Sequence, residues 1–387
     1  MPLDEQTRSQ FVTAVERFVA ERLLPAEVQV EQDGRVPDDI LGEMAALGLF
    51  GLSIPEQWGG LGLGMDDEVA VLIALCRANL SFRSAIGINN GVGSHGLLTY
   101  GSDAQRERYL PQLASGEMIA SFCLTEPDCG SDAAALRTSA RLDSDGDHWV
   151  LDGVKRYITN APSADVFTVI ARTDPASRDH RGLSAFLVDR NAPGLSIGKS
   201  DRKMGLHGSH TADVTFEHCR IPANAVIGEP GLGFALAMSS LNRGRLSIAA
   251  AAIGAGLRLM EEALDYATQR RSFGEPIAQH QLVQAMLADS ETELFAARCM
   301  LEHTAHRFDQ GLPVIKEASC CKLFATETVG KVADRVLQIF GGAGFMAEYP
   351  IERIYRDVRV MRIYEGTSQI QQLLIAKQML KEHAGKR

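Results

Sequence analysis

The spacing of apolar residues changes twice along the chain, and this order restricts the possible folds more than any other feature. From residue 4 to about 115, and again from about 232 onward, apolar residues recur every three to four positions, as expected of amphipathic helices. Between about 119 and 228 the apolar runs are short, rich in β-branched and aromatic residues, and separated by Gly, Pro, Asp and Asn, as at 166–171. The sequence therefore predicts helices, then an antiparallel β domain, then helices again, which is an α+β fold.

Length and composition are those of a globular protein with two or three domains. The chain has 387 residues, of which 45% are hydrophobic and 23% are charged, enough to form more than one packed core. We predict an N-terminal helical domain over 1–118, a middle β domain over 119–230 and a C-terminal helical bundle over 231–387. The net charge of −10 argues against non-specific nucleic-acid binding but allows a local site for a small anion.

The cysteines and the hydrophobic runs indicate a cytoplasmic protein of bacterial type. The seven cysteines include no CxxC pair, so neither a zinc site nor a disulfide framework is expected. Acidic residues begin at position 4, and the N-terminus shows neither an apolar signal core nor another targeting segment. The longest weakly polar run, Leu246 to Leu257, is too short to span a bilayer. We therefore expect no membrane insertion.

The glycine-rich stretches do not match a dinucleotide-binding fingerprint. The stretch at 59–64 has the wrong glycine spacing and no preceding strand, and those at 231–233 and 341–344 do not match either. A Rossmann unit that binds a nicotinamide is therefore not expected.

Residues 362–371, RIYEGTSQIQ, contain a candidate catalytic group. Glu365 is placed on a turn, and Gly366 after it would let the backbone approach a ligand closely. Thr367 and Ser368 can then provide an N-cap for the helix that follows. Composition alone favours a solvated surface carboxylate, whereas the position at the mouth of a helix also suits a base that must meet a substrate.

Three stretches resemble the acyl-CoA dehydrogenase family. They are 122–132 (FCLTEPDCGSD), similar to the family's TEPxxGSD segment; 270–274 (RRSFG), followed by His280 and Gln281; and 338–345 (QIFGGAGF), followed by the Glu365 turn. The resemblance extends from about residue 5 to residue 380. It implies an oxidoreductase with an N-terminal helical domain, a middle β domain and a C-terminal four-helix bundle. It also implies a homotetramer, a dimer of dimers, with one FAD per subunit.

The resemblance further implies which residues contact FAD. Backbone groups of Leu124 and Thr125 would match the donors and acceptors of the flavin edge, and Arg270 would bind the FAD of a neighbouring subunit. Tyr157 stands where the family usually has tryptophan and would shield one flavin face, although a core aromatic on a strand is also compatible. The implied contacts are Phe122, Leu124, Thr125, Gly130, Ser131, Tyr157, Ile158, Thr159, Arg270, Ser272, Phe273, Gln281, Gln338, Gly341, Gly342, Thr367 and Gln369.

In this resemblance Glu365 is the catalytic base. It would remove the α-proton of an acyl-CoA while a hydride leaves the β-carbon for the flavin, in a dry pocket that raises its pKa. Some branches of the family carry the base at the position of Gly244. In this chain the position cannot supply a base, because glycine has no side chain. Asn242 stands where an aspartate is common. The implied substrate contacts are Ser131, Asn242, Arg245, Tyr364 and Gly366.

The expected electron acceptor is a separate electron-transfer flavoprotein, since no nicotinamide site is recognised. Two other function classes stay open, a flavin monooxygenase or oxidase on the same scaffold and a non-catalytic binding member of the family. Glu365 argues against the first class, and the acidic net charge argues against a nucleic-acid-associated member of the second.

Overall fold

Helices make up the N-terminal part of the computed structural model, which describes residues 3–177 and 179–385. Asp4 caps the first helix by accepting a hydrogen bond from the backbone N–H of Thr7, and Ser102 forms a capping box with Gln105 at the last. The helical prediction for this part is confirmed. The helices are α1 (Glu5–Phe18), α2 (Leu24–Asp33), which α1 reaches through a π-helical turn, α3 (Asp38–Ala46), α4 (Met65–Leu75), α5 (Leu80–Asn90), α6 (His95–Tyr100) and α7 (Asp103–Ser115).

The middle part forms a seven-stranded sheet within the described residues. In spatial order it contains β1 (Ala120–Cys123), β4 (Val166–Arg172), β2 (Ser139–Leu142), β3 (His148–Thr159), β7 (Thr211–Pro222) and β6 (Leu195–Ile197), with β5 (Leu183–Asp189) paired to β4. The antiparallel prediction is confirmed for β2–β3, β3–β7, β4–β5 and β6–β7. It is wrong for β1–β4 and β2–β4, which are parallel. The chain forms the β2–β3 hairpin between β1 and β4, so that β4 runs in the same direction as β1. The apolar pattern within a strand is the same for either direction of its neighbour, so the sequence did not indicate this pairing.

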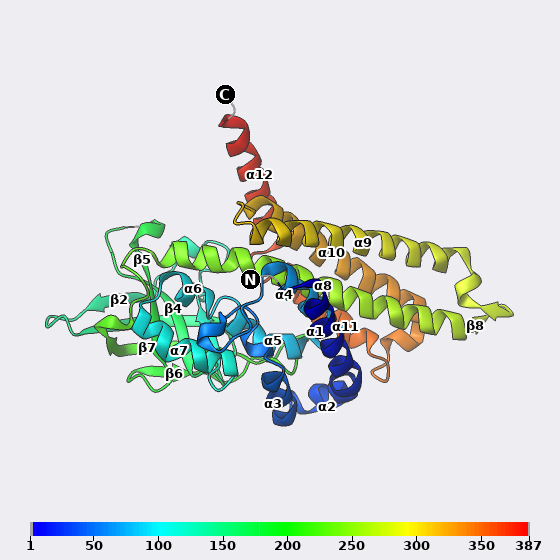
Figure 1. The fold of residues 1–387 in the computed structure, drawn as a ribbon, viewed down its shortest axis with the longest axis horizontal. Coiled ribbons are helices and arrows are strands. Elements are labelled where there is room, and N and C mark those ends of the chain that lie inside the picture. The colour runs from blue at the N-terminus through cyan, green and yellow to red at the C-terminus, as the bar shows by residue number, and fades with distance from the viewer. Residues whose placement is uncertain (1–2, 178, 386–387) are drawn as a thin grey trace.

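Long helices form the C-terminal part. Three of them, α8 (Gly233–Gln269), α9 (Gln281–Asp309) and α10 (Ile315–Phe340), pack along one another. Figure 1 shows α8 running from the sheet at one end of the molecule to the hairpin of β8 (Arg271–Ser272) and β9 (Glu275–Pro276) at the other. The shorter α11 (Ile351–Val358) also packs on α10.

The fourth long helix of the predicted bundle, α12 (Ser368–Ala384), is only partly covered. It packs on α10 and buries Ser368 and Gln371 near its N-terminal end. The rest projects away from the body (Figure 1), and Leu373, Met379 and Leu380 are exposed.

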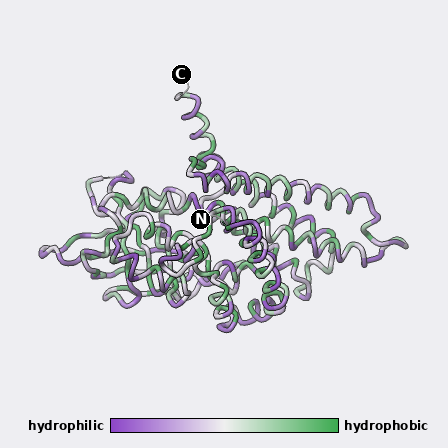
Figure 2. The backbone as a smooth tube through the Cα atoms, viewed as in Figure 1, coloured by the Kyte–Doolittle hydropathy of each residue, from purple (hydrophilic) through white to green (hydrophobic). Residues whose placement is uncertain are grey.

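The N- and C-terminal helices share one core. Phe82 of α5, Leu246 of α8 and Val329 of α10 belong to a single cluster of buried apolar side chains. In Figure 2, hydrophilic and hydrophobic segments alternate along the long helices, as expected where one face of each helix is buried. No helix in the described part of the chain is long and apolar enough to cross a membrane. The N-terminal and C-terminal helices therefore do not have separate cores. The domain limits at 118 and 230 stay a prediction.

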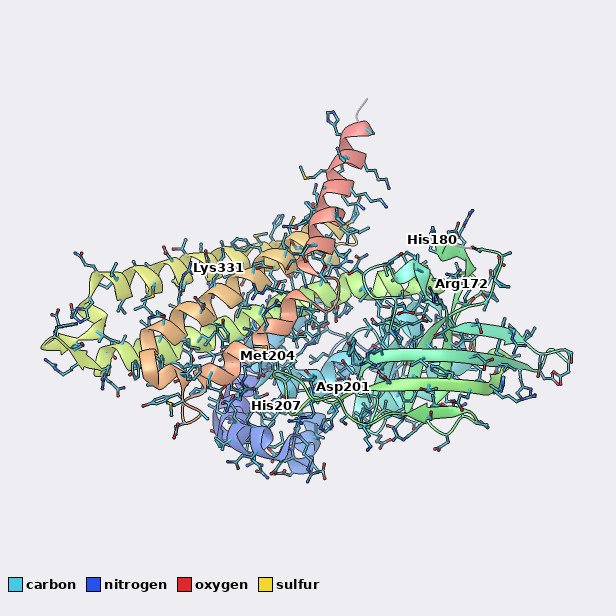
Figure 3. The ribbon with its side chains drawn as sticks, turned by 180° about the vertical axis from the view of Figure 1, so that it is seen from behind. Arg172, His180, Asp201, Met204, His207 and Lys331 are labelled. Atoms are coloured by element: carbon cyan, nitrogen blue, oxygen red, sulfur yellow. The ribbon has the colours of Figure 1, made fainter. Side chains whose placement is uncertain are left out.

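The loop between β6 and β7 lies where the helices meet the sheet. Figure 3 labels Met204 and His207 of this loop at that junction. His207 Nδ1 is 2.9 Å from the carboxylate of Glu31 in α2, so the loop is tied to the N-terminal helices.

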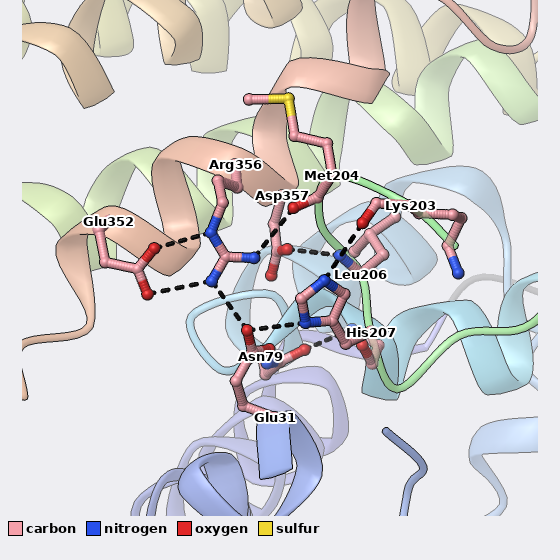
Figure 4. A network of polar contacts seen from close by, with 10 residues as sticks. Glu31, Asn79, Lys203, Met204, Leu206, His207, Glu352, Arg356 and Asp357 are labelled. Atoms are coloured by element: carbon pink, nitrogen blue, oxygen red, sulfur yellow. Dashed lines mark hydrogen bonds and ion pairs between the residues drawn. The ribbon is translucent and has the colours of Figure 1, made fainter. Parts of the chain in front are cut away.

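A polar network at the same junction anchors the segment that leads to Glu365 (Figure 4). Arg356 of α11 donates a hydrogen bond to Glu31 (2.8 Å), and Asp357 accepts one from the backbone N–H of Leu206 (2.5 Å). Since α11 leads directly into residues 359–367, these contacts hold that segment against both the N-terminal helices and the middle part.

Candidate active site

Glu365 lies in a constrained turn between a 3-10 helix, Arg359–Arg362, and α12. Its φ of 54° is in the left-handed region, which residues other than glycine adopt rarely, and Gly366 has a φ of 90°. Lys322 donates from Nζ to the carbonyl of Gly366 (2.8 Å), and Gln371 donates from Nε2 to the carbonyls of Glu365 (3.2 Å) and Gly366 (3.1 Å). These donors hold the turn in its unusual conformation and thereby fix the direction of the carboxylate.

The Glu365 carboxylate points at α8. Position 244 is a glycine, and a Cβ added there would overlap Glu365 Oε2. A side chain from position 244 and a carboxylate from position 365 would therefore occupy the same space. Gly244 removes the alternative base and at the same time leaves room for Glu365.

One oxygen of the Glu365 carboxylate is buried, and three basic side chains lie near the group. Its Oε2 atom is buried and has no hydrogen-bond partner among the described residues. Burial raises the pKa of Glu365, while the charges of Arg83, Arg245 and Lys322 oppose that rise. Burial also lowers the pKa of Lys322 to about 8. An unpaired carboxylate with a raised pKa is suited to take a proton from a weakly acidic carbon.

Most of the predicted substrate residues lie in this region. Arg245 is buried one position beyond Gly244 and donates from Nη1 to Asn242 Oδ1 (2.6 Å). The amide of Asn242 therefore serves as acceptor, as an aspartate would, but carries no charge of its own to balance that of Arg245. Burial raises the pKa of Tyr364 to about 12. Ser131 is exposed in the loop after β1, and no hydrogen bond among the described residues joins it to this group.

The predicted flavin segment after β1 is held by a buried ion pair. Lys155 of β3, which is fully buried, donates from Nζ to the carbonyl of Leu124 (3.0 Å) and to Glu126 (2.8 Å). Glu126 also accepts hydrogen bonds from two backbone N–H groups. The carbonyl of Thr125 accepts a hydrogen bond from β3 as well (2.9 Å). The peptide groups of the segment are therefore fixed in orientation.

Tyr157 is turned out of the sheet by a bulge. The pairing of β3 with β7 shifts register between Lys155 and Ile158, and Tyr157 has a φ of 59° and is 60% exposed. The Arg156 guanidinium lies 4.8 Å from its ring centre. Tyr157 is therefore not a core aromatic, an interpretation that the sequence left open, whereas the side chain of Ile158 is buried.

The remaining predicted contacts in this part lie on neighbouring segments. Phe122 is on β1, and the carbonyl of Thr159 at the end of β3 accepts a hydrogen bond from Ser121 Oγ (2.6 Å). Gly130 is exposed, with no heavy atom within 4 Å of a Cβ built there. We call this the sheet group, which consists of Phe122, Leu124, Thr125, Gly130, Ser131, Tyr157, Ile158 and Thr159.

A second set of predicted residues lies at the far end of α8, and we call it the hairpin group. Phe273 at the hairpin tip is 96% exposed with a φ of 51°, and Gln281 and Gln338 are exposed as well. The two glycines of the group have no heavy atom within 4 Å of a built Cβ. A cleft of about 720 Å³ is lined by four of its members, Arg270, Ser272, Gly341 and Gly342.

The sheet group and the hairpin group do not meet within one chain. Figure 1 places the sheet and the β8–β9 hairpin at opposite ends of the long axis, joined by α8. This helix has 37 residues and is about 55 Å long at 1.5 Å per residue. An FAD that contacts both groups must therefore lie between two chains. Two further predicted contacts belong to neither group, because Thr367 caps α12 through its hydroxyl and Gln369 is exposed on that helix.

Two basic residues near Glu365, Lys322 and Arg83, were missed by the sequence analysis. Lys322 lies between Ala318 and Thr326 at four-residue spacing on the buried face of α10, so a lysine within an apolar stripe was the available signal. Arg83 carried no comparable signal, because nothing in α5 itself indicates that its side chain reaches toward α8.

Family models match nearly the whole chain. The acyl-CoA dehydrogenase N-terminal domain matches residues 5–117, the middle domain matches 121–219 and the C-terminal domain matches 231–380. The chain belongs to the acyl-CoA dehydrogenase family. It is therefore an oxidoreductase, and the predicted three-part fold of this family is confirmed.

Individual relatives agree with this assignment. An acyl-CoA dehydrogenase of Bacillus subtilis (strain 168) is 40% identical over 366 residues, which are 95% of this chain and 96% of the relative. Butyryl-CoA dehydrogenase from Megasphaera elsdenii has a TM-score of 0.94 at 30% identity, covering 98% of this chain and 99% of that one. An acyl-CoA dehydrogenase from Bacillus anthracis, complexed with FAD, has a TM-score of 0.92 at 34% identity, covering 100% of this chain and 69% of that one.

FAD is the cofactor of this acyl-CoA dehydrogenase family, and the described residues fit it. The hairpin cleft combines the guanidinium of Arg270 with Gly341 and Gly342, whose backbone is open to close approach. A planar guanidinium suits a pyrophosphate. The sheet group adds oriented peptide groups at Leu124 and an exposed ring at Tyr157.

Proposed function

We propose that this acyl-CoA dehydrogenase converts an acyl-CoA to the trans-2-enoyl-CoA, with Glu365 as the base that removes the α-proton. The observation that supports it most directly is the buried, unpaired Oε2 of Glu365 in the space left by Gly244. FAD, when bound, supplies the acceptor for the hydride that leaves the β-carbon.

The turn can also stabilise the charge that develops on the thioester carbonyl. The backbone N–H of Glu365 donates no hydrogen bond within the described residues, so it is available to the substrate. Lys322 and Gln371 fix the two carbonyls of the same turn, which keeps this N–H oriented. A donor held in place before the reaction lowers the cost of forming an enolate-like transition state.

The second part of the proposal is that FAD lies between subunits of a homotetramer arranged as a dimer of dimers. The separation of the sheet group from the hairpin group along α8 supports an FAD shared by two chains. The exposed ring of Phe273 and the apolar side chains of Leu373 and Leu380 on α12 provide surfaces for two different contacts between chains.

The third part is that electrons leave to a separate electron-transfer flavoprotein. The glycine-rich stretches lack a nicotinamide fingerprint, and Glu365 is typical of the dehydrogenase branch. A small surface that binds only transiently is sufficient for electron transfer to a partner protein of this kind. The free cysteines are compatible with the cytoplasmic location predicted from the sequence.

The test of the reaction is anaerobic mixing of the purified holoenzyme with butyryl-CoA and longer acyl-CoAs. We expect the flavin absorbance to bleach and an enoyl-CoA to form in equal amount. A flavin that is reduced by none of these thioesters would favour the binding class. Turnover with oxygen alone, with one hydrogen peroxide per enoyl-CoA, would instead place the protein among the oxidases.

A further inference from the structure

Lys322 is a fully buried lysine of α10 that ends at the Glu365 turn. Its Nζ donates a hydrogen bond to the carbonyl of Gly366 (2.8 Å), the residue directly after Glu365. An ammonium group has three donors, and within the described residues Lys322 uses one of them in this way. The contact with the turn is therefore the main polar contact of this side chain.

Lys322 also lacks an ion pair. Within the part of the chain that the structure describes, no carboxylate lies at ion-pair distance from its Nζ, whereas Lys155, which is buried to the same extent, pairs with Glu126 (2.8 Å). A buried ammonium without a counter-ion is unfavourable. Packing alone would be served as well by an apolar side chain, so the charge at this position indicates a function.

The charged groups near Lys322 come from the turn, from α8 and from α10 itself. Burial lowers the pKa of Lys322 to about 8, the charges of Glu365 and Glu327 oppose this fall, and Arg245 adds to it. Glu327 already pairs with Arg362 (3.2 Å), which leaves Glu365 as the carboxylate that the ammonium can stabilise. In return, Lys322 is one of three charges that oppose the rise that burial causes in the pKa of Glu365.

The two arginines near Glu365 are directed differently. Arg83 donates to Ser247 Oγ (2.8 Å) and Arg245 donates to Asn242 Oδ1 (2.6 Å), both on α8. Among these three basic groups it is Lys322 whose hydrogen bond goes to the turn itself.

Resting on the proposed function, we propose that Lys322 is a positioning residue for the reaction. Its ammonium holds the carbonyl of Gly366 and keeps Glu365 in the ionised form that takes the α-proton. An opposite charge close to a carboxylate favours the ionised form, and the hydrogen bond to the turn keeps this charge beside Glu365. The charge of Lys322 thus sets the lowest pH at which the base is ready.

The first measurement is the pKa of Glu365 with and without this charge. Infrared spectroscopy of the holoenzyme as a function of pH follows the protonated carboxyl band that Glu365→Gln lacks. In Lys322→Met the pKa of Glu365 should rise by about one unit or more, since a nearby opposite charge lowers the pKa of a carboxyl by roughly 1–3 units. Lys322→Arg keeps a positive charge and should restore most of the wild-type value. Lys322→Gln serves as the neutral variant if Lys322→Met does not fold.

The same shift should appear in anaerobic flavin reduction by butyryl-CoA. In Lys322→Met the acid limb of the kcat/KM profile should move to higher pH by the same amount, so that the rate below the limb falls about tenfold for each unit. A residue that only held the turn would lower the rate by one factor at every pH and leave the limb in place. That result would overturn the proposed effect of the charge.

A matched control is Lys331→Met on the same helix. Lys331 is exposed and pairs with Glu293 (3.3 Å), so its loss should change neither the pKa of Glu365 nor the acid limb.

The two measurements separate this inference from the proposed reaction. An unchanged pKa of Glu365 in the neutral variants at position 322 would overturn the role of Lys322, even if acyl-CoAs reduce the flavin normally. If no thioester reduces the flavin, the proposed reaction fails, and the infrared titration alone decides whether Lys322 controls the ionisation of Glu365.

Discussion

Glu365 Oε2 occupies the space that a side chain at position 244 would fill. The two positions are far apart in the chain and belong to different helical segments, yet only one of them can present a group to the substrate. The absence of a side chain on α8 is therefore part of the proposed catalytic arrangement.

Gly244→Ala tests this relationship. The added methyl group would overlap the end of a flexible side chain, so we expect the fold to persist and the carboxylate to move. A displacement of about 1 Å can cost about 100-fold in rate, which stopped-flow flavin reduction would measure. Gly42→Ala in α3, where no atom lies within 4 Å of the new Cβ, is the control. An unchanged rate in Gly244→Ala would show that the carboxylate does not act from this position.

Glu365→Gln keeps the shape of the side chain and removes the base. We expect FAD content and oligomeric state to be retained, while flavin reduction by an acyl-CoA slows by about 1000-fold or more, since a positioned base contributes on this order. Glu302→Gln on α9, an exposed pair with Arg298, is the matched control. Near-normal reduction in Glu365→Gln would exclude this residue as the base.

Arg270→Ala tests the FAD site between subunits. Arg270 lines the hairpin cleft, whereas the neighbouring Arg271 donates to the carbonyl of Gly274 within the hairpin (2.7 Å). Arg270→Ala should therefore weaken FAD binding by about 10- to 100-fold, and the tetramer should dissociate at the same time. Arg271→Ala is the comparison. Flavin content by absorbance and mass by light scattering would check both, and a monomer with full FAD would contradict the shared site.

The acidic side chain that anchors α11 gives a pH dependence of stability. Burial raises the pKa of Asp357 to about 6 from a usual value of 3.8, with Glu31 adding to the rise and Leu206, Arg356 and Arg353 opposing it. A raised pKa of an acid means that the folded state favours the protonated form, so this contribution to stability is present below about pH 4 and is lost as pH rises through 6.

Asp357→Asn should remove that dependence. Relative to the wild type, the variant should gain up to about 3 kcal/mol in the free energy of unfolding between pH 4 and 8, since each pKa unit corresponds to about 1.4 kcal/mol. Its amide oxygen can still accept from the backbone N–H of Leu206. Denaturant unfolding at several pH values measures the difference, and a constant difference across this range would refute the assignment.

The choice of acceptor can be tested directly. With an acyl-CoA present, we expect sustained turnover with an electron-transfer flavoprotein or a ferrocenium dye, and little with oxygen or NAD. The reason is that the chain shows no nicotinamide fingerprint and that a bound thioester would exclude oxygen from the flavin. Sustained turnover with NAD would require a second binding site and would overturn this part of the proposal.

The sequence by itself determined the features that depend on neighbouring residues. The helical spacing of α8 to α10, the short strands of the middle part and the Thr367 cap of α12 all follow from residues within a few positions of each other. The stretches at 122–132, 270–274 and 338–345, the last followed by the Glu365 turn, together predicted the family, because the residues of each motif are contiguous.

Only the tertiary structure decided which distant segments meet. The parallel pairing of β1 with β4, the ion pair of Lys155 with Glu126 and the placement of Arg83 beside the Glu365 turn join separate elements. The Glu365 carboxylate meets Gly244 of α8, which lies more than a hundred residues away in the chain. Apolar spacing records which face of an element is buried but not which element covers it, and so these contacts could not be predicted from the sequence.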